Sequence, residues 1–207
     1  IDWNFIMEKE NLDLERRSAE ERENDQFKKL RTLLDSAKKH SEGWKPVLSE
    51  IIPGEILNKK DLQKIPITRK SELSELQNKI PPLGGLTTKP TSHFKNLFVS
   101  PGPIYDPGGS KDFWRMSRAM KAAGFIEGDI VYNTFSYHLT PAGEMMEQGA
   151  NNIGACVIPG GIGNTEQQIQ AINKLKPNRY VGTPSFLKTI LEKGKESNID
   201  VSSLKTG

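Results

Sequence analysis

A tyrosine and a histidine at the end of a predicted strand are the residues best placed for chemistry in this sequence. Tyr137 and His138 follow the apolar run 129–135 and precede Thr140-Pro141, which is a typical helix start. Open α/β sheets bind ligands at the carboxyl ends of their strands, so we predict that this segment lines a pocket. A packed or a surface position is the alternative for His138. Because side chains alternate along a strand, only one of the pair need face the pocket, and we favour Tyr137.

Two glycine-rich segments raise the question of phosphate binding. Residues 159–165, Pro-Gly-Gly-Ile-Gly-Asn-Thr, lie between a predicted strand and a predicted helix. Such a turn either holds a phosphate on helix N–H groups or serves as a tight strand-to-helix connection. The segment lacks a Walker lysine and the GxGxxG spacing, which favours the connection.

The second segment, residues 100–110, follows a predicted strand and contains three prolines and three glycines. It is either a rigid loop or a loop shaped to cover the edge of the sheet where ligands bind.

Other site chemistries find no support in the sequence. Metal-ligand spacings such as CxxC and HExxH are absent, so we predict no metal site. Ser185 lacks the GxSxG context of a hydrolase nucleophile. The single cysteine, Cys156, has no intrachain partner and lies in a predicted buried strand, which indicates core packing in a reducing compartment.

The first 80 residues read as a charged helical arm. They hold 16 basic and 16 acidic side chains, 32 of the 55 in the chain. Ser18 and Glu21 form a capping box, and apolar residues at helical spacing then predict an amphipathic helix of about 20 residues. A shorter helix is expected over 71–78. We expect the arm to lay its apolar stripe on a larger body, and we place the domain boundary near Pro81-Pro82.

Residues 81–207 alternate between strand-like and helix-like segments, which is typical of an α/β fold. Strands are predicted at 96–100, 129–135, 155–158 and 179–182. Helices are predicted between and after them, with starts at Ser110, at Thr140, at a capping box from Thr165 to Gln168, and at Thr183-Pro184. This alternation predicts a mostly parallel sheet covered by helices, incomplete at the C-terminus.

The charge and the hydropathy of the chain argue against two classes of binding partner, nucleic acids and membranes. The formal net charge is +3 and no Lys/Arg run exceeds two residues, which argues against nucleic-acid binding. No apolar run approaches the roughly 18 residues that a membrane span needs, and no signal peptide is visible. We therefore expect a cytoplasmic protein that does not bind membranes.

Several motifs, taken in order along the chain, resemble phenylacetate–CoA ligases, which belong to the adenylate-forming acyl-CoA synthetase superfamily. The resemblance runs from about residue 20 to the end. The matching segments are 62–73 (Leu62, then Ile-Pro-Ile-Thr-Arg-Lys-Ser-Glu-Leu), 124–129 (Gly-Phe-Ile-Glu-Gly-Asp), Tyr137, 154–161 (Gly-Ala-Cys-Val-Ile-Pro-Gly-Gly), Thr165, Gln168, Lys176-Pro177 and 183–186 (Thr-Pro-Ser-Phe).

This resemblance implies an enzyme that uses ATP and magnesium to join a small carboxylic acid, aromatic or other, to AMP and then exchanges AMP for coenzyme A. It places the acyl group near Tyr137, Thr140 and Gly143. His138 has no clear counterpart in the family and is included on its position alone.

The sequence departs from the family at the phosphate loop. A Ser/Thr/Gly-rich loop with a lysine should follow Val99, but the chain has Ser100-Pro-Gly-Pro. Proline has no backbone N–H to donate. Ser100, Gly102, Gly108 and Gly109 are what is left for the nucleotide, in an atypical loop that we expect not to hold ATP in the standard way.

A second departure is that the family's adenine-binding segment, ribose aspartate and catalytic lysine have no match, so no catalytic residue is assigned. We predict the N-terminal part of an acid–CoA ligase that is inactive alone. Because its sheet has an open edge, we expect it either to self-associate as a homo-oligomer or to be only marginally stable. The alternative is a repurposed relative that binds an acyl ligand or partner without ATP.

Overall fold

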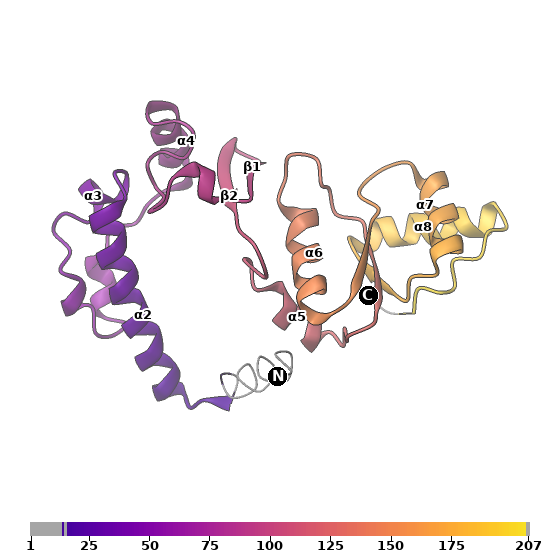
Figure 1. Ribbon diagram of the computed structural model, residues 1–207, viewed down its shortest axis with the longest axis horizontal. Coiled ribbons are helices and arrows are strands. Elements are labelled where there is room, and N and C mark those ends of the chain that lie inside the picture. The colour runs from indigo at the N-terminus through magenta and orange to yellow at the C-terminus, as the bar shows by residue number, and fades with distance from the viewer. Residues whose placement is uncertain (1–13, 15, 206–207) are drawn as a thin grey trace. The chain divides into compact units, whose positions relative to one another are not determined.

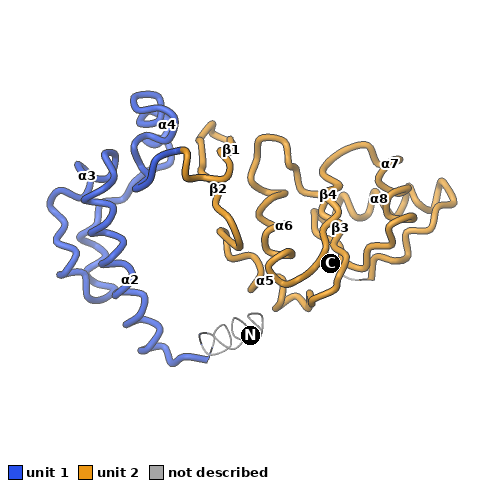
Figure 2. Tube along the Cα trace, in the orientation of Figure 1, with its two compact units in different colours: residues 1–91 blue, residues 92–207 orange. Residues whose placement is uncertain are grey.

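The chain forms two compact units that divide between Thr91 and Ser92 (Figure 2). The computed structural model describes residue 14 and residues 16–205. Residues 1–13 of the predicted arm therefore lie outside the described part of the chain. Each unit has its own buried apolar residues, so each is described separately.

The first unit is built around the long helix α2 (Ala19–His40). The predicted capping box is confirmed: Ser18 Oγ accepts from Glu21 N, and the Glu21 carboxylate accepts from Ser18 N at 2.9 Å. The apolar side chains of α2 pack within the first unit itself. The chain turns back after Ser41, and Phe27 and Leu34 pack with Leu48, Ile51 and Ile56 of the same unit.

Short helices complete the first unit (Figure 1). They are α3 (Trp44–Val47), η1 (Pro53–Glu55), η2 (Asp61–Lys64) and α4 (Lys70–Lys79), with η3 (Thr91–His93) at the division. The helix predicted over 71–78 is thus confirmed as α4, one residue longer at each end.

The second unit contains a three-stranded parallel sheet, as predicted. Its strands are β3 (Ile130–Asn133), β4 (Cys156–Pro159) and β5 (Arg179–Val181). The spatial order is β4-β3-β5, and β3 is parallel to both neighbours. Successive residues of β3 face opposite sides of the sheet, so Val131 and Tyr132 belong to different cores.

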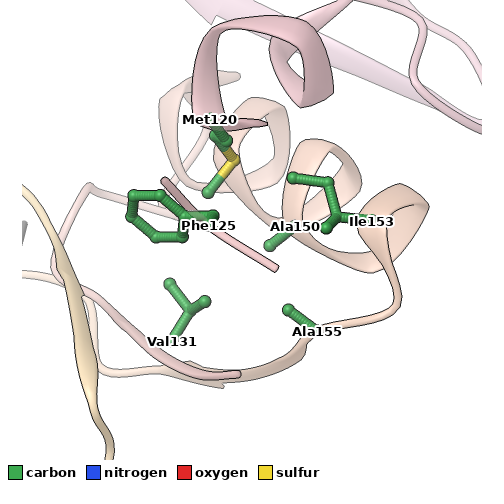
Figure 3. Close-up of a cluster of buried hydrophobic side chains, with 6 residues drawn as sticks. All are labelled: Met120, Phe125, Val131, Ala150, Ile153 and Ala155. Atoms are coloured by element: carbon green, nitrogen blue, oxygen red, sulfur yellow. The ribbon is translucent and has the colours of Figure 1, made fainter. Parts of the chain in front are cut away.

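Helices cover both faces of this sheet (Figure 1). On one face, α5 (Met116–Ala122) and α6 (Ala142–Ile153) supply Met120, Ala150 and Ile153, which pack on Val131 (Figure 3). On the other face, α7 (Thr165–Leu175) and α8 (Pro184–Glu196) supply Ile169, Ile172 and Ile190, which pack with Tyr132. The second unit is therefore a three-layer α/β arrangement, and the predicted fold class is confirmed.

The first predicted strand lies outside this parallel sheet. β1 (Asn96–Ser100) pairs antiparallel with β2 (Ile104–Gly108), and the two form a separate two-stranded sheet. Residues 100–110, expected to form a loop, thus supply a second strand. The prolines permit this because a strand with only one partner leaves some N–H positions unused.

Three local predictions need correction. Ser110 does not begin α5: the Asp112 carboxylate accepts from Met116 N at 2.7 Å and from Ser117 N at 3.1 Å. The predicted capping box at Thr165 does not form, because the Gln168 side chain donates to the carbonyls of Gly161 and Gly163 instead. Cys156 is exposed, since it lies at the start of an edge strand. The Thr183-Pro184 start is confirmed, with Thr183 Oγ1 accepting from Phe186 N.

Within the described part of the chain, none of the helices combines the length and apolar character needed to cross a bilayer.

Candidate functional site

The connections that leave the sheet diverge at its carboxyl edge. The segment after β3 leads to α6 on one face, whereas the segments after β4 and β5 lead to α7 and α8 on the other. In open α/β sheets, ligands bind where neighbouring connections part in this way. The end of β3, residues 133–143, is therefore the candidate site.

A buried amide organises this end of β3. Asn133 has no exposed surface, and its Nδ2 donates to the Tyr137 hydroxyl and to the Gly143 carbonyl, both at 2.8 Å. Its Oδ1 accepts from Phe135 N at 3.1 Å. Because a carbonyl only accepts, the bond to Gly143 fixes which end of the amide is the donor. One side chain thus holds the loop and the first turn of α6 together.

The Tyr137 ring is held on its face as well as at its hydroxyl. A Cβ placed on Gly143 would lie 2.7 Å from Tyr137 Cδ2, so glycine is what lets the ring pack against this helix turn. Burial, and then the hydrogen bond to the Glu147 carboxylate, raise the pKa of Tyr137 well above its ordinary range. The phenol therefore stays neutral and presents its ring, not a charge.

A second hydroxyl cluster bridges β3 and β5. Thr134 Oγ1 donates to the Tyr180 hydroxyl at 2.8 Å, and the Tyr180 hydroxyl donates to the Thr183 carbonyl at 3.1 Å. Gly182 permits this approach, because a Cβ there would overlap both hydroxyls. Burial is the main cause that raises the pKa of Tyr180. This second cluster thus consists of neutral hydrogen-bonding groups.

The remaining predicted pocket residues have different exposures. Thr140 is half-buried, and its hydroxyl contacts the Ser136 carbonyl at 3.4 Å. His138 is exposed, and its backbone N–H donates to Ser136 Oγ at 3.2 Å. The structure therefore brings Tyr137, Thr140 and Gly143 together and places His138 at the surface beside them.

The β1–β2 hairpin is attached to the candidate site by a backbone bond. Val99 N donates to the Leu139 carbonyl at 2.8 Å, and Leu139 adopts a left-handed φ of 61°. The same hairpin carries the residues predicted for the nucleotide.

Those four residues do not lie in one loop. Ser100 and Gly102 are at the turn of the hairpin, whereas Gly108 pairs with Asn96 at its far end. Gly108 packs under Phe98, and Gly109 packs under Phe113. The two glycines at the far end thus serve the packing of aromatic rings.

The glycine-rich turn at 159–165 is closed by its own helix. Gly161 and Gly163 adopt positive φ, and both of their carbonyls accept from Gln168 Nε2, at 3.1 and 2.7 Å. Gly161 N donates to the Asn133 carbonyl at 3.0 Å. These contacts support the interpretation of this segment as a tight connection.

The opposite, amino edge of the sheet is charged. Asp129 is 3% exposed and accepts from Ile126 N, Asn178 Nδ2 and Arg179 Nε at 2.7–2.9 Å. Burial alone would raise the pKa of Asp129, but these hydrogen bonds outweigh it and hold the pKa below the ordinary value. Arg179 also lies over the Phe125 ring, 5.4 Å from its centroid.

A separate groove lies in the first unit. It has a volume of about 350 Å³ and its lining is mainly apolar. The residues that line it are Trp44, Val47, Pro66, Ile67, Thr68, Glu72, Leu73, Glu75, Leu76, Lys79 and Leu86. Among residues 14 and 16–205, no group of three His, Cys, Asp or Glu side chains is placed to hold a metal ion.

The sequence analysis missed Asn133, Thr134 and Tyr180. A signal for Asn133 was present, since a polar amide inside the apolar run 129–135 needs a buried partner. The partners themselves come from α6 and from the loop that follows β3, so only the folded arrangement identifies them.

The chain is similar to curated phenylacetate-coenzyme A ligases. It is 30% identical to the one from Aromatoleum evansii over 165 residues, which cover 75% of this chain and 36% of that protein. It is 28% identical to the one from Pseudomonas putida, covering 74% of this chain and 36% of that protein. No protein-family model matches. These relatives confirm the resemblance seen in the motifs, and the chain spans about a third of their length.

Solved structures confirm the fold. 2-Hydroxyisobutyryl-CoA ligase, in an open conformation with 2-HIB-AMP and CoA, superposes with a TM-score of 0.81 at 22% identity. The match covers 91% of this chain and 43% of that one.

Proposed function

We propose that this chain is the N-terminal part of an ATP-dependent carboxylic acid–CoA ligase and that it supplies the acid-binding edge. The observation that carries the proposal is the Asn133–Tyr137–Gly143 cluster, which lies at the diverging carboxyl edge of the sheet. The same segment matches the acyl region in the resemblance to phenylacetate–CoA ligases. The complete enzyme would join the acid to AMP and then transfer the acyl group to CoA.

The chemistry of the site favours an acid with an apolar side chain. The Tyr137 hydroxyl is engaged by Asn133 and Glu147, so its ring is the part left for a ligand. A ring of this kind adds about 0.5–1.5 kcal/mol to the binding of an aromatic group, beyond simple burial. We therefore propose an aromatic or other small carboxylic acid, with Tyr137, Thr140 and Gly143 nearest to it and His138 at the rim.

The hairpin does not fit a triphosphate. Pro101, Pro103 and Pro107 have no N–H, and Gly108 and Gly109 are packed under aromatic rings. We assign no nucleotide contact to Ser100, Gly102, Gly108 or Gly109, and no Mg²⁺ ligand to the described residues. When bound, ATP supplies the AMP that activates the carboxylate, and CoA supplies the thiol that accepts the acyl group.

Self-association is a further part of the proposal. β4 and β5 each have a single partner among the described residues, and unpaired strand edges favour pairing with a second copy. Sedimentation analysis of the 207-residue chain should show concentration-dependent dimers, whereas a monomer at every concentration would contradict this. We propose a cytoplasmic location, in line with a single unpaired cysteine.

The test is acid-dependent adenylation by the full-length protein. With ATP, Mg²⁺ and phenylacetate, we expect labelled pyrophosphate to exchange into ATP, and we expect added CoA to release AMP. A panel of aliphatic and aromatic acids then defines the substrate. Acid binding without exchange would instead support a repurposed relative that binds an acyl ligand without ATP. No binding and no exchange with any acid would overturn the proposal.

A further inference from the structure

The fully buried Asn133 amide has a role that the proposed pocket does not yet explain. It lies at the last position of β3, where an apolar residue would suit the surrounding core. Burying an amide is costly unless its donors and acceptor are all satisfied. All are satisfied here, and each bond goes to residues 135–143, the segment that forms the proposed acid site.

The two Nδ2 bonds join the loop to the first turn of α6, alongside the Gly143 N–H bond to the Ser136 carbonyl and the bond between the Tyr137 hydroxyl and Glu147. One reaches the hydroxyl at the far end of the Tyr137 ring, and the other reaches the Gly143 carbonyl in the first turn of α6. The ring face contacts Gly143 itself. The ring is therefore held at its tip by the amide and on its face by the helix that the same amide holds.

We propose that Asn133 is the positioning residue for acid binding, acting by locking the Tyr137 ring against the first turn of α6. This inference rests on the proposed function, because the ring is taken to be the wall that the acid meets. Asn133 itself is enclosed and touches no ligand. It acts through Tyr137, so it changes how well the acid is held and not the chemistry of activation.

A residue of this kind affects ground-state and transition-state binding alike. Its loss should therefore raise KM for the acid and leave kcat nearly unchanged. One net hydrogen bond corresponds to about a five- to tenfold change in KM. A purely structural residue would lower the melting temperature without this selective change.

The main experiment compares the buried Asn133 amide with the half-buried Asn178 amide at the other edge of the same sheet, in the full-length protein. Asn133→Ala removes the two Nδ2 hydrogen bonds to Tyr137 and Gly143 at the carboxyl edge, which we call the clamp. Asn178→Ala is the matched control at the amino edge, where the Asn178 amide donates to Asp129 and accepts from Ile130 N. With phenylacetate as the probe, we expect KM to rise about five- to tenfold in Asn133→Ala and to stay within about twofold of wild type in Asn178→Ala. Equal KM changes in both variants would overturn the proposal.

A second pair of variants covers the case in which Asn133→Ala does not fold. Tyr137→Phe removes the same hydrogen bond from the other side, together with the hydroxyl's bond to Glu147, and deletes only one oxygen atom. It should give a similar rise in KM. Asn133→Asp keeps the volume but loses the donor, so it should resemble Asn133→Ala. Wild-type KM in both Tyr137→Phe and Asn133→Asp would contradict the clamp.

A spectroscopic measurement separates the failure of this inference from the failure of the proposed function. Ring-carbon line shapes of labelled tyrosine report how fast the Tyr137 ring flips, and they require no turnover. We expect faster flipping in Asn133→Ala and unchanged flipping in Asn178→Ala. If the protein uses no acid but the ring is freed only in Asn133→Ala, the proposed function fails and the clamp stands. If the flip rates match in the two variants, the clamp fails whatever the activity.

Discussion

The two edges of the parallel sheet in the second unit are built from different chemistry. At the amino edge, a buried carboxylate is paired with Arg179 and accepts a hydrogen bond from the Asn178 amide, and the cluster ties the starts of β3 and β5 together. At the carboxyl edge, the Asn133 amide and the Tyr137 hydroxyl form a hydrogen-bonded network that also reaches the Glu147 carboxylate, and Gly143 allows close packing. A carboxylate paired within a closed cluster stabilises the fold, whereas a hydrogen-bonded tyrosine beside a diverging connection leaves a ring available to a ligand.

The largest expected effect is on stability and comes from the amino edge. Asp129→Ala leaves Arg179 and Asn178 without the carboxylate that accepts from both of them. Breaking such a buried pair should lower the free energy of unfolding by about 3 kcal/mol, measured by urea denaturation. Glu192→Ala, which removes an exposed helix ion pair with Lys188, should leave the transition almost unchanged. Similar losses of unfolding free energy in the two variants would show that the Asp129 cluster stabilises the fold no more than an exposed ion pair does.

The same cluster should make the stability of the protein depend on pH in the acid range. The pKa of Asp129 is lower in the folded chain than its ordinary value of 3.8. Its contribution is therefore fully present above that value and is lost as the pH falls through the lower, folded pKa. Stability curves measured by urea denaturation between pH 5 and pH 2 should fall less steeply in Asp129→Asn than in wild type. Parallel curves would contradict this assignment.

At the carboxyl edge, adding one methyl group should disturb the site. Gly143→Ala places a Cβ 2.7 Å from the Tyr137 ring, so the ring or the helix turn must move. We expect a loss of about 1–3 kcal/mol in stability and a weaker affinity for the acid, measured by denaturation and by calorimetry. Gly54→Ala, where a Cβ would meet open space, is the control. Unchanged acid affinity in Gly143→Ala would show that the Tyr137 ring does not line the acid site.

A smaller effect is expected at alkaline pH. Burial raises the pKa of Tyr132 to about 12 and raises the pKa of Tyr137 and Tyr180 as well. These groups contribute stability that is fully present below the ordinary tyrosine value of 10.0 and is lost as the pH rises towards the folded values. The free energy of unfolding should therefore decline above about pH 10, and less so in Tyr180→Phe. An equal decline in wild type and Tyr180→Phe would contradict this.

The predictions from sequence succeeded where local rules decide the structure. The Ser18 capping box and the Thr183-Pro184 helix start depend on neighbouring residues only, and both are present. The three parallel strands were found from short apolar runs. The role of Tyr137 in the site stays a prediction, although the structure packs its ring against Gly143.

The failures concern which segments pair with each other. β2 follows β1 directly in a hairpin, but an apolar run does not encode its neighbour, so the place of β1 outside the parallel sheet was not predicted. Cys156 was expected inside because its strand is apolar, yet its place at a sheet edge leaves it exposed. The Asn133 clamp was missed for the same reason, since Gly143 lies ten positions away across a loop.

The most direct test is the affinity of the full-length protein for phenylacetate, measured by calorimetry in two variants. Tyr137→Ala removes the ring at the carboxyl edge, whereas Trp44→Ala alters the groove of the first unit. The account predicts that the dissociation constant rises about tenfold or more in Tyr137→Ala, equivalent to about 1.4 kcal/mol, and is unchanged in Trp44→Ala. An unchanged dissociation constant in Tyr137→Ala, together with a rise in Trp44→Ala, would place the acid elsewhere and contradict the account.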